Sequence, residues 1–128
     1  LKQLYIDSKL GLIIDGTGRD YNKISKQKNE MEQFGYDTFM VFVNTSLEVA
    51  LERNASRSRA VGEKLVKRFW YAVQSNIGKF QSLFGTNNFI VIDNNKTDEN
   101  LLNKVFVSVR KFVNVPPKSR IARQWIGA

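Results

Sequence analysis

The sequence contains no cysteine and no histidine. The absence of cysteine excludes disulfides, thiol catalysis and thiolate metal sites, and it fits the reducing cytosol, so we expect a cytoplasmic location. Without histidine, the chain lacks the commonest general base and the commonest metal ligand. Any chemistry must therefore use carboxylates, hydroxyls, amides, lysine or arginine.

Long apolar runs are also missing. No run of about 18 apolar residues occurs, so neither a membrane span nor a membrane partner is expected. The first nine residues mix charged and apolar side chains and lack the apolar block of a signal peptide. The chain begins with Leu1 rather than Met, and Leu1, Leu4 and Tyr5 have helical spacing. We therefore interpret the sequence as part of a longer or processed protein.

What the chain does contain is a large excess of positive charge. Its 128 residues suit one domain, with 42% hydrophobic and 25% charged residues, and the net charge is +8. A basic surface attracts the phosphates of nucleotides, nucleic acids or anionic lipids. Composition does not choose among these partners, and a basic protein without a phosphate ligand fits equally well.

Apolar patterning predicts alternating strands and helices. Short apolar runs bounded by turn residues indicate strands, at 12–14, 38–43 and 89–92. Apolar residues spaced three or four apart indicate helices, at 21–34, 46–54, 61–84 and from Thr97 or Asp98 to 113. The expected inner positions include Val61, Leu65 and Phe80 in the long helix and Leu102 in the last one.

This order of elements predicts an α/β fold with three layers, in which helices flank a mostly parallel sheet. The domain is expected to span residues 1–115, followed by a basic tail at 116–128 after two prolines. Ligands of such sheets bind beyond the carboxyl ends of the strands. The polar clusters 15–19, 44–46 and 93–95 are therefore expected to meet at one edge.

The first candidate motif is Asp15-Gly16-Thr17-Gly18-Arg19. A carboxylate at a strand end can hold Mg²⁺ or accept a hydroxyl proton, and an arginine can bind a phosphate through two hydrogen bonds. The alternative is an ordinary turn from strand to helix, with Asp20 near the start of the helix.

The second candidate motif is a basic run that begins with Arg53, Arg57 and Arg59 and continues with Lys64, Lys67 and Arg68. Arginines spaced in this way can surround a polyphosphate and stabilise the charge that develops during phosphoryl transfer. The alternative is a solvated basic loop. The neighbouring aromatic residues Trp70 and Tyr71 could stack on bases, although packing against another helix explains them as well.

Both motifs resemble parts of P-loop nucleotide kinases. The segment 15–19 is similar to the Asp-Gly-Phe-Pro-Arg motif of adenylate kinases and to the Gly-Thr-x-Arg turn of zeta-toxin-like kinases. The run from Glu52 to Arg59 resembles the arginine-bearing lid of the same superfamily. Residues 11–112 resemble the C-terminal two-thirds of such a domain, and the set as a whole is most similar to uncharacterised phage-type kinases.

The resemblance implies roles for eight residues. These are catalysis for Asp15, Arg57 and Arg59, substrate or phosphate binding for Thr17, Arg19 and Arg53, and a place near the nucleotide base for Asn94 and Asn95. It implies that Asp15 lies near Mg²⁺ and that the whole protein uses Mg²⁺ and ATP, with neither bound by this chain alone. The expected partner is a nucleotide or a phosphorylated small molecule.

Two departures from the kinase pattern limit what the resemblance implies. Gly18 stands where adenylate kinases have proline, which argues against a nucleoside monophosphate as acceptor. The chain contains no Gly-x-x-x-x-Gly-Lys-Ser/Thr loop, which cradles the phosphates of ATP. In the family this loop follows a strand that lies between the first two strands seen here. We therefore expect an inactive C-terminal portion of a kinase that fills the gap internally or by self-association.

Two other functions remain open. The chain could be a non-catalytic nucleic-acid-binding module that uses Lys64, Lys67, Arg68 and the basic tail. It could also be a structural domain built on a degenerate kinase scaffold, because a fold does not determine a function.

Overall fold

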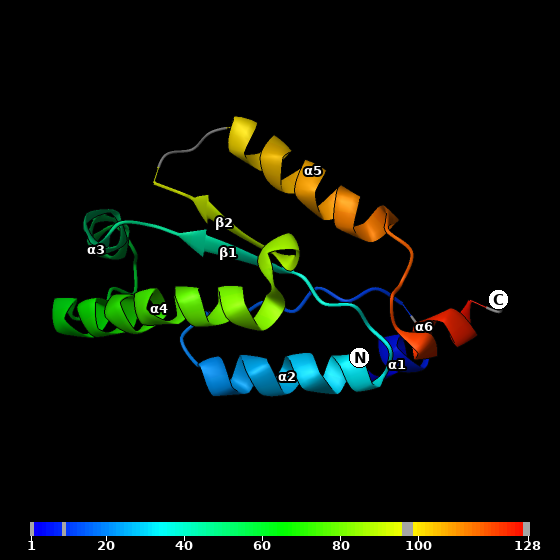
Figure 1. The fold of residues 1–128 in the computed structure, drawn as a ribbon. Coiled ribbons are helices and arrows are strands. Elements are labelled where there is room, and N and C mark those ends of the chain that lie inside the picture. Colours follow the sequence, from blue (N-terminus) through cyan, green and yellow to red (C-terminus); the bar gives the residue numbers. More distant parts are fainter. Residues whose placement is uncertain (1, 9, 96–98, 127–128) are drawn as a thin grey trace.

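The computed structural model describes residues 2–8, 10–95 and 99–126 and shows a mixed α/β fold that is mostly helical (Figure 1). The elements are α1 (Lys2–Asp7), α2 (Tyr21–Gln33), β1 (Met40–Asn44), α3 (Leu47–Ala55), α4 (Glu63–Phe84), the 3₁₀ turn η1 (Thr86–Asn88), β2 (Phe89–Asp93), α5 (Glu99–Asn114) and α6 (Arg120–Trp125). The four predicted helices are confirmed as α2, α3, α4 and α5. The predicted cap of the last one, Thr97 or Asp98, lies outside the described residues. None of the described helices is long and apolar enough to cross a membrane.

β1 and β2 form a two-stranded parallel sheet. Their register runs from Met40 opposite Phe89 to Asn44 opposite Asp93. Both strands are rich in aromatic and β-branched residues, which pack well on a pleated surface. α5 runs along one side of the pair, while α4 and α2 run along the other (Figure 1). The predicted strands 38–43 and 89–92 are therefore confirmed, with small shifts at their ends.

The third predicted strand, 12–14, is wrong. Residues 10–20 form an irregular segment, in which Ile13 is 100% exposed and Ile14 is 48% exposed. A strand needs a neighbour to receive its backbone hydrogen bonds, and no described residue pairs with 12–14. The apolar run is present, but the described residues contain no partner strand that would order it. The expected three-stranded sheet therefore has two strands within the described residues.

Phe80 of α4 is the centre of the hydrophobic core and has no exposed surface. Its ring centroid lies 5.6 Å from that of Tyr21 in α2 and 6.2 Å from that of Phe42 in β1. Phe42 is itself buried and lies 6.4 Å from Phe89 at the start of β2. One side chain of α4 thus connects α2 to the sheet.

The predicted apolar faces are only partly buried. Near the beginning of α4, Val61 remains 45% exposed and Leu65 37% exposed, and Leu102 of α5 is 69% exposed. The expectation that these three side chains lie inside is wrong. Helical spacing identifies the face that turns toward the core, but it does not tell how far along the helix the packing partner extends.

The helix boundaries follow from local capping. Asp20 caps α2 by accepting a hydrogen bond from the Lys23 amide at 3.0 Å, and Ser46 caps α3 by accepting one from the Val49 amide at 3.2 Å. Gly35 follows α2 with φ of 102°, a left-handed conformation that favours glycine. The sequence-based interpretation of these residues as helix boundaries is confirmed.

The end of the chain packs beside its beginning. The Tyr36 hydroxyl donates to the Leu10 carbonyl at 2.7 Å, and the Tyr36 ring lies 5.5 Å from the Trp125 ring of α6. The Lys118 amide donates to Asp37 at 3.0 Å. Part of the expected tail, 116–128, is therefore the helix α6, which lies next to α1 (Figure 1).

Because Phe80 fills the junction of three elements, Phe80→Ala is expected to lower the free energy of unfolding by about 3–5 kcal/mol. Urea denaturation followed by circular dichroism measures this loss. Phe106→Ala is the matched control, since Phe106 of α5 is 62% exposed, and it should change stability by about 0.5 kcal/mol or less. Equal effects of the two substitutions would contradict this core.

Burial raises the pKa of the Tyr36 hydroxyl above its ordinary value of 10.0. The folded state therefore favours the protonated phenol, so its contribution to stability is complete below pH 10 and is lost as the pH rises through the raised pKa. The urea midpoint should fall more between pH 9 and pH 11 in the wild-type chain than in Tyr36→Phe, which has no hydroxyl to ionise. An identical decline in both proteins would argue against this role.

Candidate functional site

The candidate site lies where β1 and β2 end, in the segments 44–46 and 93–95, which we call the carboxyl edge. The Asn94 amide donates to the Asn44 carbonyl at 2.8 Å, which prolongs the strand pairing. The Asn95 side chain accepts a hydrogen bond from the Ser46 amide at 2.7 Å. Two of the three predicted polar clusters therefore meet. Asn94 and Asn95 organise this edge through their backbone and amide groups.

Arg53 connects α3 to the carboxyl edge. Its guanidinium donates to the Asn94 carbonyl at 2.6 Å across 41 residues of sequence. The remaining N–H groups of this exposed side chain have no ion-pair partner among the described residues. Arg53, which was predicted to bind phosphate, is thus held in place by this contact. It brings one positive charge to the strand ends.

The loop between α3 and α4 carries Arg57 and Arg59. Both residues are exposed, and neither guanidinium forms an ion pair within the described part of the chain. The loop is held by Asn54, which is only 8% exposed. Its side chain donates to the Val61 carbonyl at 2.8 Å and accepts from the Val61 amide at 3.1 Å. The two arginines therefore stand on a loop whose two ends are fastened together.

Helix α4 fixes β1 at its carboxyl end. The Trp70 indole donates to the Thr45 carbonyl at 2.8 Å, and the Gln74 amide donates to the Asn44 side chain at 2.6 Å. The indole N–H of Trp70 is therefore used inside the protein, by the segment after β1. The adjacent Tyr71 is 60% exposed.

The same helix holds the turn of the first motif. Asn76 of α4 is 5% exposed, and its side chain donates to the Gly18 carbonyl at 3.0 Å and to the Arg19 carbonyl at 2.8 Å. Neither Asn54 nor Asn76 was predicted as important. The sequence feature that could have identified them is a polar residue on the apolar face of a helix. Asn76, for example, lies between Val73 and Phe80 in the helical repeat.

The side chains of the first motif take up three different environments. The Arg19 guanidinium lies 4.0 Å above the Phe69 ring, a contact that leaves its in-plane N–H groups available to a ligand. The Thr17 hydroxyl accepts from the Arg19 amide at 3.4 Å, and Asp15 is exposed. Gly18 has φ of 72°, and a Cβ added there would lie 3.2 Å from the Phe42 ring, so the position favours glycine.

The structure thus brings Arg53, Asn94 and Asn95 together directly. Thr17 and Arg19 are joined to this group indirectly. Helix α4 holds the Gly18–Arg19 turn through Asn76 and the end of β1 through Trp70 and Gln74. Among the described residues, no three acidic side chains gather as a metal site.

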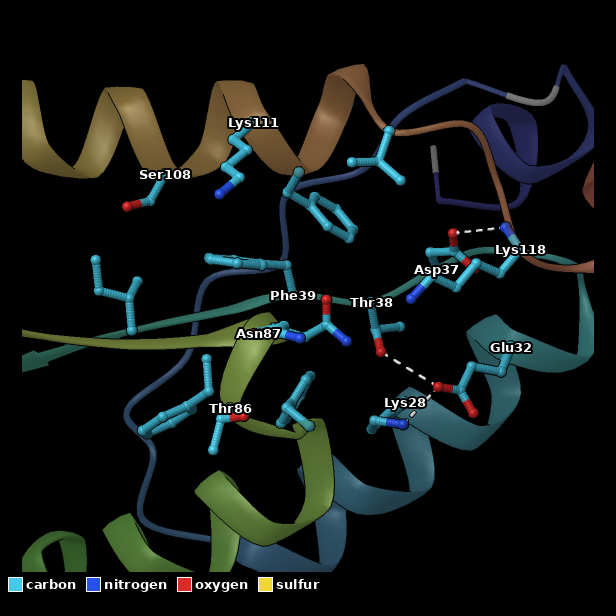
Figure 2. A pocket seen from close by; sticks show the side chains of 16 residues that line it. Lys28, Glu32, Asp37, Thr38, Phe39, Thr86, Asn87, Ser108, Lys111 and Lys118 are labelled. Carbon is cyan, nitrogen blue, oxygen red and sulfur yellow. Dashed lines mark hydrogen bonds and ion pairs between the residues drawn. The ribbon is translucent and has the colours of Figure 1, made fainter.

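A hollow of about 620 Å³ lies away from the carboxyl edge, at the amino-terminal ends of the strands (Figure 2). None of the eight predicted site residues lines it. Glu32 is engaged there by Lys28 and by the Thr38 hydroxyl, which donates to it at 3.3 Å. Because the Glu32 carboxylate is already paired with these neighbours, the hollow is a weaker candidate site than the carboxyl edge.

No protein-family model, curated protein or solved structure matches this chain.

Asn76→Asp should release the turn at 18–19, because it removes both donors and places a carboxylate against two carbonyl groups. We expect a loss of about 1–3 kcal/mol in the free energy of unfolding, the cost of unsatisfied buried groups. Trypsin should also cut after Arg19 faster than in the wild-type chain. Asn103→Asp, on the exposed face of α5, is the control and should change neither measurement.

Proposed function

We propose that this chain is the acceptor-binding and phosphate-binding part of an ATP-dependent kinase with a three-layer, P-loop-like fold. The observation that supports the proposal most is the attachment of the Gly18–Arg19 turn, the end of β1 and the end of β2 to one another through α4 and Arg53. Ligands of parallel sheets bind beyond the carboxyl ends of the strands, where this assembly lies.

In this proposal the arginines supply the electrostatics of phosphoryl transfer. Arg57 and Arg59 contact the transferred phosphate, whose charge spreads over its outer oxygens in the transition state. Arg19 binds the acceptor or its phosphate through the edge of a guanidinium that Phe69 supports from below. Arg53 positions the edge and faces the phosphates with its remaining donors. The partner that this chain binds is a nucleotide or a phosphorylated small molecule.

The remaining roles follow from position. Asn94 and Asn95 lie at the end of β2, next to the place proposed for the nucleotide base. Thr17 contributes a hydroxyl within the turn. Mg²⁺ in kinases is held by one or two carboxylates together with the phosphates of the substrate. Asp15 is exposed and can supply one such carboxylate. When bound, the metal ion neutralises charge on the phosphate oxygens.

Because the sequence has no Gly-x-x-x-x-Gly-Lys-Ser/Thr loop, the proposal predicts anion binding without turnover by this chain. Tripolyphosphate should bind in isothermal titration calorimetry. The double substitution Arg57→Ala with Arg59→Ala should weaken binding about tenfold or more, since a hydrogen bond to a charged group contributes about 1.5–3 kcal/mol.

The matched control removes the same charge at the other end of the molecule. Lys118→Ala with Arg120→Ala should leave the affinity for tripolyphosphate within about twofold, since charges beyond a Debye length of about 10 Å are screened. Equal losses in both double variants would show nonspecific attraction and would overturn the proposed site. A steady kinase or ATPase rate that Arg57→Ala abolishes would contradict the proposed lack of turnover.

Nucleic-acid binding is the second candidate function. Lys64, Lys67 and Arg68 are exposed on the first half of α4, and Tyr71 next to them is 60% exposed. The basic C-terminal segment does not belong to the same surface, because α6 lies near the other end of α4 (Figure 1). An affinity for single-stranded DNA that falls steeply with salt, without any preference for tripolyphosphate, would favour this candidate.

A further inference from the structure

A large groove separates residues 11–18 from β1. Its volume is about 1040 Å³, and its walls are the irregular segment 11–18 and the strand residues 40–43. α2 and α5 contribute the remaining walls through residues such as Met31 and Val109. The groove therefore runs along one edge of the two-stranded sheet.

The backbone of β1 is unpaired on the side that faces this groove. Because the Asn94 amide donates to the Asn44 carbonyl, residues 40, 42 and 44 direct their backbone groups toward β2. Backbone groups alternate in direction along a strand, so those of Val41 and Val43 point away from β2. Neither residue has a backbone hydrogen bond to another described segment on that side.

The opposite wall has the same property. Within the described residues, no backbone N–H of residues 11–16 donates a hydrogen bond. Apolar side chains of this wall are poorly covered, since Ile13 is 100% exposed and Ile14 is 48% exposed. On the facing wall, Val43 of β1 is 54% exposed. The charged residues of the lining are few and include Asp15 and Lys28. The groove thus combines free backbone donors and acceptors with apolar side chains.

We propose that this groove binds an extended, uncharged peptide strand that pairs with the free edge of β1. An extended backbone supplies donors and acceptors at the spacing of Val41 and Val43, and its alternating side chains cover the apolar walls. A strand of about five residues matches the length of β1, at about 3.3 Å per residue. A helix satisfies its own backbone groups and offers none to the edge.

The groove is independent of the arginines at the carboxyl edge. Under the proposed function, the strand that enters it is the one that carries the phosphate-binding loop. The two proposals fail separately, since tripolyphosphate binding tests the arginines and strand binding tests the groove.

The probe is a fluorescein-labelled peptide with the centre Val-Ile-Val-Ile-Val, flanked by Gly and Lys for solubility. Fluorescence anisotropy should show saturable binding to the whole chain. A second peptide with the centre Val-Pro-Val-Pro-Val lacks two backbone donors and should not bind. Equal binding of both peptides would overturn strand pairing.

Two pairs of variants locate the binding. Ile13→Asp should weaken the affinity for the probe about tenfold or more, because it places a carboxylate in the apolar groove. Leu102→Asp, an equally drastic change at another exposed apolar position, should have little effect. Val43→Pro removes an N–H that faces the groove, whereas Val91→Pro removes one at the far edge of β2, so only the former should weaken binding.

Circular dichroism of each variant establishes that it is folded, and the Ile13 and Leu102 variants test the groove even if a proline disrupts the sheet. The absence of probe binding, or equal losses in both members of the Ile13 and Leu102 pair, would refute the proposal. A wild-type dimer that Ile13→Asp converts to a monomer in sedimentation would also refute it, since a second copy would then occupy the groove.

Discussion

The packing of Phe80 against Tyr21 and Phe42 is the contact on which the rest of the structure depends. A sheet of two strands cannot form a core by itself, since it buries little on either face. Its stability has to come from helices that pack on it. Because Phe80 joins α2 and α4 to β1 at one point, the long helix α4 has a fixed position along the strands. The polar contacts of α4 can then reach the strand ends.

These polar contacts explain how a small sheet can organise a site. Gln74 and Asn76 project from different sides of α4, where Gln74 binds the end of β1 and Asn76 binds the Gly18–Arg19 turn. In a larger sheet, pairing between neighbouring strands would hold these segments in place. Here side-chain amides do so, and each is satisfied by a carbonyl or another amide, as buried polar groups require. Arg53 is bound to Asn94 at this edge, while Arg57 and Arg59 lie exposed on the loop that follows α3.

The groove beside β1 and the missing third strand are two aspects of one physical fact. Residues 12–14 have the apolar composition of a buried strand, yet Ile13 is fully exposed. Composition creates the tendency to pair, but pairing requires a neighbour within hydrogen-bond distance. Within the part of the chain that the structure describes, the edge of β1 is free on one side of the groove and the apolar segment 12–14 is unpaired on the other. Unpaired edges of this kind bind other strands readily, so the same geometry that leaves 12–14 irregular makes the groove a binding surface.

Local chemistry was readable from the sequence. The spacing of apolar residues determined helices α2 to α5, Asp20 and Ser46 determined where two of them begin, and the aromatic and β-branched runs determined both strands of the sheet. These features depend on residues a few positions apart, so the chain determines them without reference to distant contacts. The candidate residues around Arg19 and Arg53 were proposed from the sequence, because charge and glycine placement are visible there, and their functional roles stay predictions.

Only the tertiary structure decided which segments meet. It assigned the buried amides of Asn54 and Asn76 to the loops that they hold, exposed Leu102, and left 12–14 without a strand partner among the described residues. Each of these outcomes depends on the distance between elements that lie far apart in the chain. Helical and strand periodicities define which face is apolar, but a face is buried only where another element reaches it. The segment 12–14 shows this most clearly, because its composition favours a strand while no described strand lies beside it to pair with.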